Sequence, residues 1–418
     1  MNEDERRYVD ALEKKIELLQ QENEDLKCKL LAFMNENTPS SKLRKRNTPP
    51  PGGVRFPGKP KGSNGGGIQL PEPDVVDEHV LDTCPDCGSK QLVKERTRSQ
   101  RVLDFPEKPI ICTDHQVPEY HCNGCDHTVT AFDINTLNHY GPRLQAIATM
   151  LKSQGLSFGK IAAFFNQLGT SSMSASSILS FTTKTSKALA HTRGALFRAA
   201  KKAHIGHKDE TGFRRDGKNG WVWTLCNPMH TIYIVAHSRS HVVAAQLRNP
   251  KQISVTDGYQ VYKKDIIRQL CWAHLLRKAE RYAEDYPELE DQHLRLKTFY
   301  TQLVVWCLDP PDYKRFNEAK WILEDVATVL GSRRHGRKLA TYIKNGGTDW
   351  LTALRYSGVP LTNNLAERAL RSVVVLRKMM GCYRNWKGAK FIENVHSVLT
   401  TWQLQGINGF QALTAKLT

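Results

Sequence analysis

The stretch His204-Ile-Gly-His-Lys-Asp209 predicts a β-strand that carries a carboxylate near its end. Two β-rich runs follow it, Gly220-Trp-Val-Trp-Thr-Leu-Cys226 and Thr231-Ile-Tyr-Ile-Val-Ala236. The dipeptide Asn227-Pro228 between them is a turn signal, so the three runs are expected to form a strand meander.

A second predicted strand also ends in a carboxylate. A helix is expected over residues 240–247, and Gln252-Ile-Ser-Val-Thr-Asp257 then predicts a strand, with Gly258 allowing a tight exit. Strands in this order can lie side by side in one mixed sheet. We therefore expect Asp209 and Asp257 to meet at one edge of that sheet.

A third carboxylate, Glu367, lies in Thr362-Asn-Asn-Leu-Ala-Glu-Arg368, which has the polar residues of a capped helix start. Apolar residues then recur at helical spacing: Ala366, Ala369, Leu370, Val373 and Leu376. Taken alone, Glu367 could equally form a surface ion pair with Arg371, itself a candidate DNA contact, and each aspartate could be a turn or cap residue. The combination of two strand ends and a helix favours a common site.

Three carboxylates of this kind suit a pair of Mg²⁺ ions, because magnesium prefers hard oxygen ligands and also binds phosphate oxygens. Two ions about 4 Å apart can activate a water or a 3′-hydroxyl and stabilise the oxygen that leaves a phosphodiester. In this interpretation Asp209 bridges both ions, while Asp257 and Glu367 each hold one of them.

The motif Cys271-Trp-Ala-His274 follows Asp257 at the start of a basic helix that includes Arg277 and Lys278, two candidate DNA contacts. His274 has two open interpretations: it positions a catalytic water or a phosphate, or it is structural. A C-x-x-H pair can ligate zinc, but the sequence offers no second pair nearby.

The composition bounds the class of protein. The chain has 418 residues, and Lys+Arg 60 against Asp+Glu 42 gives a net charge of +18, which favours a polyanionic partner such as DNA. Its length predicts more than one domain. No apolar run approaches the roughly 20 residues that cross a bilayer, and the N-terminus is no secretory signal, so no membrane partner is expected. Ten cysteines with two C-x-x-C pairs favour a reducing, cytoplasmic location and metal binding.

A zinc module is predicted by Cys84-Pro-Asp-Cys87 and Cys122-Asn-Gly-Cys125. The two-residue gap lets both sulfurs of a pair reach one ion at about 2.3 Å, and two pairs complete a tetrahedral structural site. Residues 102–105 and 110–112 are expected to be the strands of a hairpin between the pairs. Substitute ligands are available nearby: Cys112, His115, His121 and His127.

The N-terminal segment predicts a two-stranded coiled coil. Its seam alternates three- and four-residue spacings: Val9, Leu12, Ile16, Leu19, Asn23, Leu26, Leu30 and Phe33. Asn23 at a core position favours a parallel dimer, so we expect a homodimer or higher oligomer. A single amphipathic helix is the alternative. The Pro-, Gly- and Ser-rich residues after it predict a flexible linker whose basic run could touch phosphates: Lys42, Arg44, Lys45 and Arg46.

A helix-turn-helix is predicted after residue 143. Leu144, Ile147, Ala148 and Leu151 share one helical face. Ser157 can cap a second helix that Gly169 ends, and Ser174 can cap a third. Lys160 and Ser176 on these helices are candidate DNA contacts. Any small helical bundle has similar spacing, which is the alternative interpretation.

These motifs together resemble the insertion-sequence family 66 transposases, a branch of the DDE transposases with a ribonuclease H-like core. The resemblance rests on the three carboxylate motifs, on Cys271-Trp-Ala-His274 and on the order of the parts, and it covers nearly the whole chain. It departs from the family pattern at Ser372 and Lys208. It implies strand cleavage and transfer at the terminal inverted repeats of a prokaryotic element, a nucleoid-associated location, and accessory proteins from the same element.

The predicted fold class is therefore multidomain α+β with a ribonuclease H-like mixed sheet and a helical insertion. The expected boundaries are 1–35 for the coiled coil, 36–72 for the linker, 73–135 for the zinc module, 136–196 for the helix-turn-helix, 197–284 and 361–418 for the two parts of the catalytic core, and 285–360 for the insertion. Two alternative functions stay open: a DNA-binding regulator with an inactive core, and a ribonuclease H-like nuclease.

Overall fold

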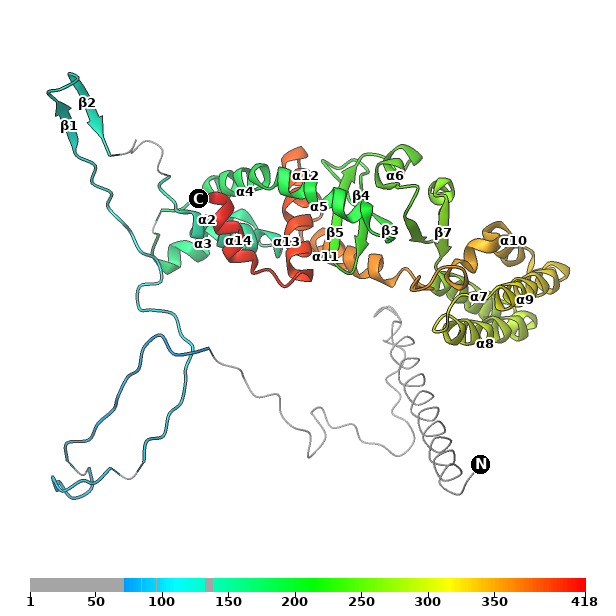
Figure 1. Cartoon of the computed structure of the whole chain (residues 1–418), viewed down its shortest axis with the longest axis horizontal. Helices are drawn as coiled ribbons and strands as arrows, with labels where there is room; N and C mark the ends of the chain where they lie inside the picture. The colour runs from blue at the N-terminus through cyan, green and yellow to red at the C-terminus, as the bar shows by residue number, and fades with distance from the viewer. Residues whose placement is uncertain (1–70, 84, 95, 132–137, 171) are drawn as a thin grey trace, which may run out of the picture.

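The computed structural model describes residues 71–83, 85–94, 96–131, 138–170 and 172–418 (Figure 1). The predicted coiled coil over residues 1–35 lies outside the described residues, as do residues 36–70 of the linker with their basic run and Cys84 of the first cysteine pair. Helices and strands form a mixed α+β fold around one larger sheet. None of the described helices combines the length and the apolar character needed to span a membrane.

The larger sheet has five strands in the order β5-β4-β3-β6-β7. Their bounds are β3 Ile205–Gly212, β4 Trp221–Asn227, β5 His230–Ala236, β6 Ile253–Thr256 and β7 Ile267–Leu270. Strands β3, β4 and β5 form the antiparallel meander, whereas β6 and β7 run parallel to β3. The meander and β6 confirm the predicted strands, but β3 continues past Asp209 to Gly212 and β7 was not predicted.

Both faces of the sheet are covered, because alternate side chains of each strand point to opposite sides. On one face Trp223, Leu225 and Ile232 pack with Ala200 of α5 (Ala190–Lys202) and with α6 (His241–Leu247). The expected helix over 240–247 is thus confirmed, with Ser240 as its N-cap residue. On the other face, Val222 and Tyr233 pack against α11 (Asn364–Met380) and the turn Ile392–His396.

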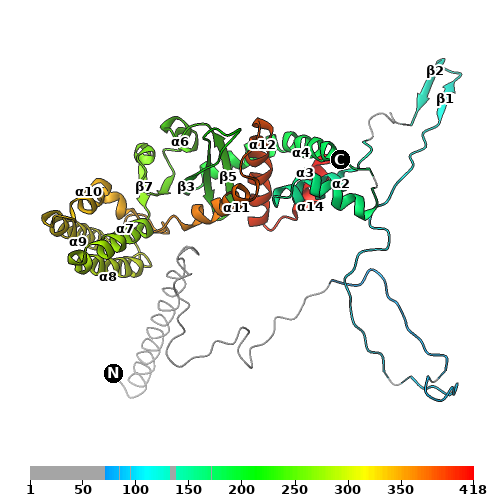
Figure 2. The same cartoon turned by 180° about the vertical axis from the view of Figure 1, so that it is seen from behind.

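One end of the molecule is helical. The helices α7 (Trp272–Asp285), α8 (Glu290–Trp306), α9 (Tyr313–Ser332) and α10 (Arg337–Gly346) lie beyond β7 in Figures 1 and 2. Their shared core includes Trp272, Phe299 and Trp350, and it continues into the sheet through Val255 and Leu270. The chain then returns to the sheet as α11, which explains how Glu367 reaches a site built on distant strands.

A helical bundle forms the other end (Figures 1 and 2). It contains α2 (Pro142–Ser153), α3 (Phe158–Phe165) and α4 (Ala175–Ala188), with α12 (Trp386–Phe391), α13 (Ser397–Leu404) and α14 (Gly409–Leu417) beside them. The caps at Ser157 and Ser174 are confirmed, since each side chain accepts a backbone N–H of the following turn. The predicted inner face of α2 was partly wrong: Ile147 is 37% exposed, while Ala146 and Thr149 are buried. The reason is that α2 packs against both α4 and α14.

The second cysteine pair lies in a hairpin of β1 (Glu119–Cys122) and β2 (His127–Thr130). The strands predicted over 102–105 and 110–112 were wrong: neither range is a strand. Pro106 and Pro109 interrupt this stretch, and proline cannot donate to a strand ladder. The observed hairpin instead turns through the cysteine pair itself, where the Asp126 N–H donates to the Cys122 carbonyl at 2.8 Å.

Candidate active site

Asp209 lies on β3, and Asp257 directly follows the parallel neighbouring strand β6. The register pairs His207 of β3 with Val255 of β6, the last pair of this ladder, and both chains continue from there toward the two aspartates. Neighbouring strands are about 4.8 Å apart, and parallel strands bring their carboxyl ends to the same edge. This arrangement is compatible with the predicted meeting of the two aspartates, which stays a prediction.

Burial raises the pKa of Asp209 to about 8. The Glu210 backbone N–H, which donates to the Asp209 carboxylate at 2.8 Å, opposes this rise. The negative charges of Glu210, Asp257 and Glu367 raise the pKa of Asp209 further. The charges of both other predicted ligands thus act on Asp209. Its own negative charge is unfavourable there unless a cation is bound nearby.

Asn363 positions the helix that carries Glu367. Its buried side-chain amide donates to the carbonyl of Lys208 at 2.8 Å, and its amide oxygen lies 3.1 Å from Nδ1 of His207. Its backbone N–H donates to Sγ of Cys271 at 3.1 Å. These bonds hold the start of α11 against β3 and against the residue that follows β7. Asn363 is the N-cap residue of α11. Its side chain bonds to β3, however, and makes no capping hydrogen bond.

Glu367 points to α7. Its Oε1 lies 2.9 Å from Nη2 of Arg277 and 3.7 Å from Nε2 of His274. The alternative ion pair between Glu367 and Arg371 does not form: Arg371 is exposed, and Arg277 donates to the Glu367 carboxylate instead. Burial lowers the pKa of His274, and the charge of Arg277 lowers it further. The negative charges of Glu367 and Asp257 raise it, but by less. The structure thus brings His274 to the predicted site, and it places Arg277 inside the site.

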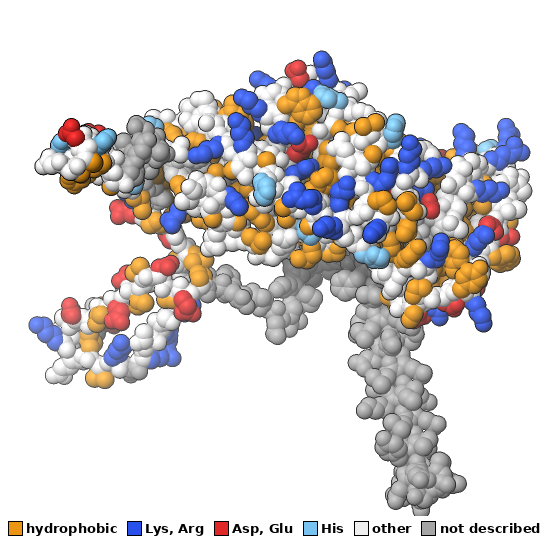
Figure 3. Space-filling view, turned by 45° about the horizontal axis from the view of Figure 1, so that its top comes forward, with side chains coloured by type: hydrophobic (Ala, Val, Ile, Leu, Met, Phe, Trp, Pro, Cys, Tyr) orange, Lys and Arg blue, Asp and Glu red, His pale blue; other side chains and the backbone are white. Residues whose placement is uncertain are grey.

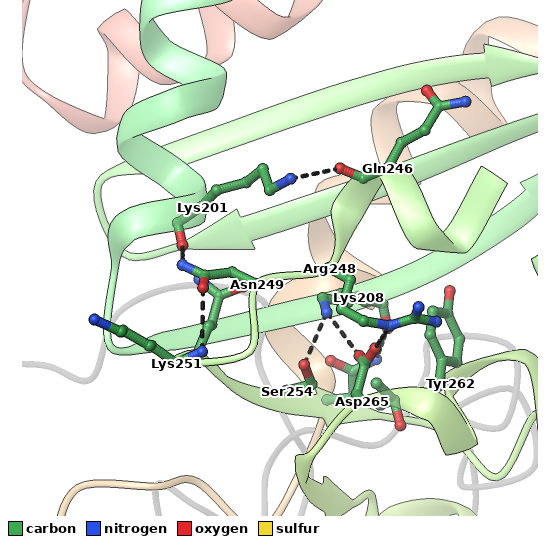
Figure 4. Close-up of polar contacts among 12 residues, drawn as sticks. Lys201, Lys208, Gln246, Arg248, Asn249, Lys251, Ser254, Tyr262 and Asp265 are labelled. Carbon is green, nitrogen blue, oxygen red and sulfur yellow. Dashed lines mark hydrogen bonds and ion pairs between the residues drawn. The ribbon is translucent and has the colours of Figure 1, made fainter. Parts of the chain in front are cut away.

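A second charged network supports β3 from the opposite face of the sheet (Figure 4). The buried Lys208 ammonium donates to Asp265 at 2.7 Å and to Ser254 at 2.8 Å, and Arg248 donates to the same aspartate at 2.9 Å. Burial lowers the pKa of Lys208, and the charge of Asp265 opposes that effect. Lys208 precedes Asp209 in the chain but points away from it, because successive strand residues face opposite sides.

Glu210 is a buried carboxylate that sequence reasoning missed. Arg239 donates to it from Nε at 2.8 Å, and the Tyr262 hydroxyl donates at 2.5 Å. Arg239 in turn lies over the ring of Tyr259, at 4.0 Å from the centroid. Glu210 therefore has its own partners on the face away from Asp209. The only signal for it in the sequence was its position next to Asp209.

The remaining predicted DNA contacts are spread over the surface. Lys160 and Ser176 are exposed on α3 and α4 of the helical bundle, and Arg371 is exposed on α11. Lys278 lies with its ammonium 4.1 Å from the ring centroid of Tyr342. The face drawn in Figure 3 carries Lys and Arg along its length and few acidic side chains. Such a surface is favourable for a polyanion.

The three described residues of the two cysteine pairs, Cys87, Cys122 and Cys125, are not gathered in one site. Backbone N–H groups of Gly124 and Cys125 lower the pKa of the Cys122 thiol, and such bonds favour a thiolate ligand. Cys87 is exposed, and among the described residues no set of ligands gathers within the two knuckles. In both Figures 1 and 2 the segment that begins at residue 71 runs apart from the β1–β2 hairpin. Binding of zinc supplies the folding free energy of such modules, so convergence is expected with the ion bound.

A mixed sheet with one carboxylate on its central strand and another directly after the neighbouring parallel strand, in a strongly basic chain, is typical of proteins that process nucleic-acid phosphates. Residues 138–391 match the family model described as Transposase IS66 family. Residues 82–126 match the zinc-finger binding domain of transposase IS66. The chain belongs to the Transposase IS66 family, which confirms the resemblance drawn from its motifs. No curated protein sequence matches it.

Family membership implies a DNA-processing enzyme that binds DNA and carries a zinc-binding module. The geometry of the site supports proposals about the roles of single residues, the catalytic metal and the steps of the reaction.

Proposed function

We propose that this protein is a DDE-type transposase that cleaves and transfers DNA strands at the terminal inverted repeats of its insertion sequence, with two Mg²⁺ ions. The observation that carries this proposal is that the negative charges of both Asp257 and Glu367 raise the pKa of the buried Asp209, while β6, which Asp257 follows, runs parallel to β3. The three carboxylates come from segments far apart in the sequence, which a chance surface cluster would not require.

The sheet supports assignment to the ribonuclease H-like folds. Its order β5-β4-β3-β6-β7, with the first three strands antiparallel and the last two parallel to β3, is the arrangement expected of such a core. Asp209 lies on the central strand, Asp257 follows the neighbouring strand, and Glu367 lies in the first turn of α11. The helices α8, α9 and α10 interrupt this core between its second and third carboxylates.

The donor set fits Mg²⁺, because carboxylate oxygens are its preferred ligands and Asp209 gains a cation that offsets its buried charge. Asp209, Asp257 and Glu367 would hold the ions, which when bound activate the attacking oxygen and stabilise the leaving one. Asn363 keeps Glu367 in place, and His274 presents a neutral imidazole beside it. Arg277, held near the site by Glu367, can contact a phosphate of the bound DNA.

Two alternatives predict different products. A DNA-binding regulator would bind element ends without cutting them, and a ribonuclease H-like nuclease would cut without joining. The test is to incubate the full chain with DNA that carries the element end, target DNA and Mg²⁺, and to resolve the products on a denaturing gel. Strand-transfer products support the proposal, whereas cleavage alone or binding alone would replace it with one of the alternatives.

We also propose that α2, α3 and α4 form a helix-turn-helix, with DNA along the exposed side of α4. A cavity of about 800 Å³ there includes Lys160, Arg384 and Lys387 in its lining. A neighbouring hollow of about 400 Å³ includes Ser176, Lys184 and Lys187. None of the described residues that line either hollow is acidic. Two adjoining hollows whose charged lining residues are all basic, beside a polar helix face, are complementary to a phosphate backbone.

Replacing Lys184, Lys187 and Lys387 together by alanine is expected to weaken binding to any DNA sequence, because phosphate contacts carry little sequence information. The slope of log affinity against log salt concentration should become shallower by about 3, roughly one for each lost contact. Fluorescence anisotropy over a range of salt concentrations measures this slope. Lys297→Ala, on the exposed side of α8 in the helical insertion, is the matched control and should leave the slope unchanged.

The remaining expectations concern parts beyond this core. We propose zinc ligation by Cys84, Cys87, Cys122 and Cys125, the domain boundaries given above, a cytoplasmic location near the nucleoid, and accessory proteins from the same element. We further propose that residues 1–35 form a dimeric coiled coil, with residues 36–72 as a linker. Deleting residues 1–35 should halve the mass measured by light scattering, and an unchanged mass would exclude this role.

A further inference from the structure

Cys271, His274 and Glu367 form a compact set of three different metal-ligating groups. The sulfur, one ring nitrogen and one carboxylate oxygen all lie within 4.8 Å of one another. Nε2 of His274 and Oε1 of Glu367 are 3.7 Å apart. In the part of the chain that the structure describes, this is the one group of three such residues close enough to hold an ion. The sequence offered only the C-x-x-H pair, and the fold supplies the third ligand from a distant helix.

The local structure explains why these groups converge. Cys271 is the N-cap residue of α7, and the His274 N–H donates to its carbonyl at 3.1 Å, so both side chains leave the same first turn. The Asn363 N–H donates to the Cys271 sulfur at 3.1 Å and lies one turn before Glu367. Backbone N–H bonds of this kind orient and stabilise a metal-bound sulfur from outside the coordination sphere. The bond thus fixes the sulfur and brings the first turn of α11 beside it.

The chemistry of the donors selects the class of ion. Sulfur and imidazole ligands suit Zn²⁺ and Co²⁺, whereas Mg²⁺ prefers oxygen ligands alone. Ligands of tetrahedral zinc lie about 3.5 Å from one another, given bond lengths of roughly 2.0–2.3 Å. The His274–Glu367 pair, at 3.7 Å, already has nearly this spacing, and no pair in the group has to contract by more than about 1.3 Å. The His274 and Glu367 side chains are 33% and 28% exposed, which leaves both free to make this adjustment.

We propose that Cys271, His274 and Glu367 form a second zinc site, separate from the cysteine pairs of the zinc finger. Arg277, whose Nη2 lies 2.9 Å from Glu367, releases that carboxylate when the ion binds. Three protein ligands leave the fourth position of a tetrahedral ion open. Because Glu367 is also the proposed Mg²⁺ ligand, zinc here would compete with the catalytic metal. This competition rests on the proposed function, but the zinc site itself does not.

The first test measures the zinc content of the full chain by mass spectrometry of the metal after dialysis. We expect two ions per chain in the wild type and one in His274→Ala, whose partly exposed side chain can be removed without a buried cavity. Cys271→Ser should also lose one ion, and thermal melting shows whether this buried substitution remains folded. Cys307→Ser, a change at a partly buried thiol in the helical insertion, is the matched control and should keep two ions. Folded His274→Ala with two ions would overturn the proposal.

A second readout identifies the sulfur. In a chain that carries Cys122→Ser and Cys125→Ser, added Co²⁺ should still give a thiolate-to-cobalt charge-transfer absorption, and His274→Ala should abolish it. Absorption that persists in the combined variant would assign the signal elsewhere and reject the site. If the metal is lost as expected but no variant or wild-type sample cleaves DNA, the zinc site stands and the proposed transposase reaction fails.

The competition has its own measurement. Zinc beyond one equivalent should inhibit Mg²⁺-dependent cleavage by the wild-type chain. A tenfold rise in Mg²⁺ should raise the Zn²⁺ concentration for half inhibition by about tenfold, since both ions bind the same carboxylate. Inhibition that is independent of Mg²⁺ would exclude Glu367 as the shared ligand.

Discussion

Asp209→Asn is expected to lower the rate of strand cleavage by roughly 10³-fold or more, while its affinity for element-end DNA changes little. An amide is a weak, neutral ligand, so the variant would hold the catalytic ions poorly, whereas the basic residues of the hollow beside α4 lie elsewhere. Gel assays of cleavage and anisotropy measurements of binding separate the two effects. Asp285→Asn, an exposed aspartate at the end of α7, is the control and should retain full activity.

The same substitution should stabilise the magnesium-free protein at alkaline pH. The pKa of Asp209 is raised to about 8 from 3.8, so between these values the folded protein binds a proton that the unfolded chain has released. Stability from this group is present below pH 4 and is lost as the pH rises to about 8. The neutral amide of the Asp209→Asn variant does not titrate, so the variant has no such loss. Calorimetry in magnesium-free buffer should show the variant several degrees more stable at pH 9 and little different at pH 5. A lower melting temperature at pH 9 would contradict the inferred environment.

Lys208→Met should destabilise the folded protein by about 3 kcal/mol or more, because it leaves the buried Asp265 without its closest cation. Arg248 still contacts that aspartate, which places the expected loss at the lower end of the range for broken buried pairs. Urea unfolding followed by circular dichroism measures the difference. Lys201→Met is the matched control: its ammonium donates to the exposed carbonyl of Gln246 in Figure 4 and lies 5.6 Å from the ring centroid of Phe197, so its loss should cost less than about 1 kcal/mol. Equal losses for both variants would show that the buried pair is not structurally important.

The parts of the fold that the sequence predicted are those with local signals. The strands around Trp223 and Val255 have buried β-branched and aromatic residues, and Asn227-Pro228 marks the turn between two of them. Caps at Ser157 and Ser174 were predicted because they act within one helical turn. The neighbouring places of β3 and β6 were predicted from the order of the strands, and the effect of the Asp257 charge on the pKa of Asp209 supports the further prediction that their carboxylates meet.

The parts that were missed depend on long-range partners. Strand β7 contains Arg268 and Gln269, which look like surface residues. They are buried because Asp349 pairs with the arginine and the Trp350 carbonyl accepts from the glutamine amide. Likewise, Asn363 has the sequence context of a helix cap, yet its side chain bonds β3. Hydrogen-bond partners some 80 to 155 positions apart leave no periodic pattern in the sequence.

Helix α11 links two regions that a transposition reaction has to coordinate. Its first turn holds Glu367, and its last residues, Met379 and Met380, line the larger cavity beside the helical bundle. The seventeen residues of α11 form a rigid helix about 25 Å long. This is the length of roughly seven base pairs of DNA duplex. If the bundle binds DNA as proposed, the helix would set a constant distance between the scissile phosphate and the DNA that the bundle contacts.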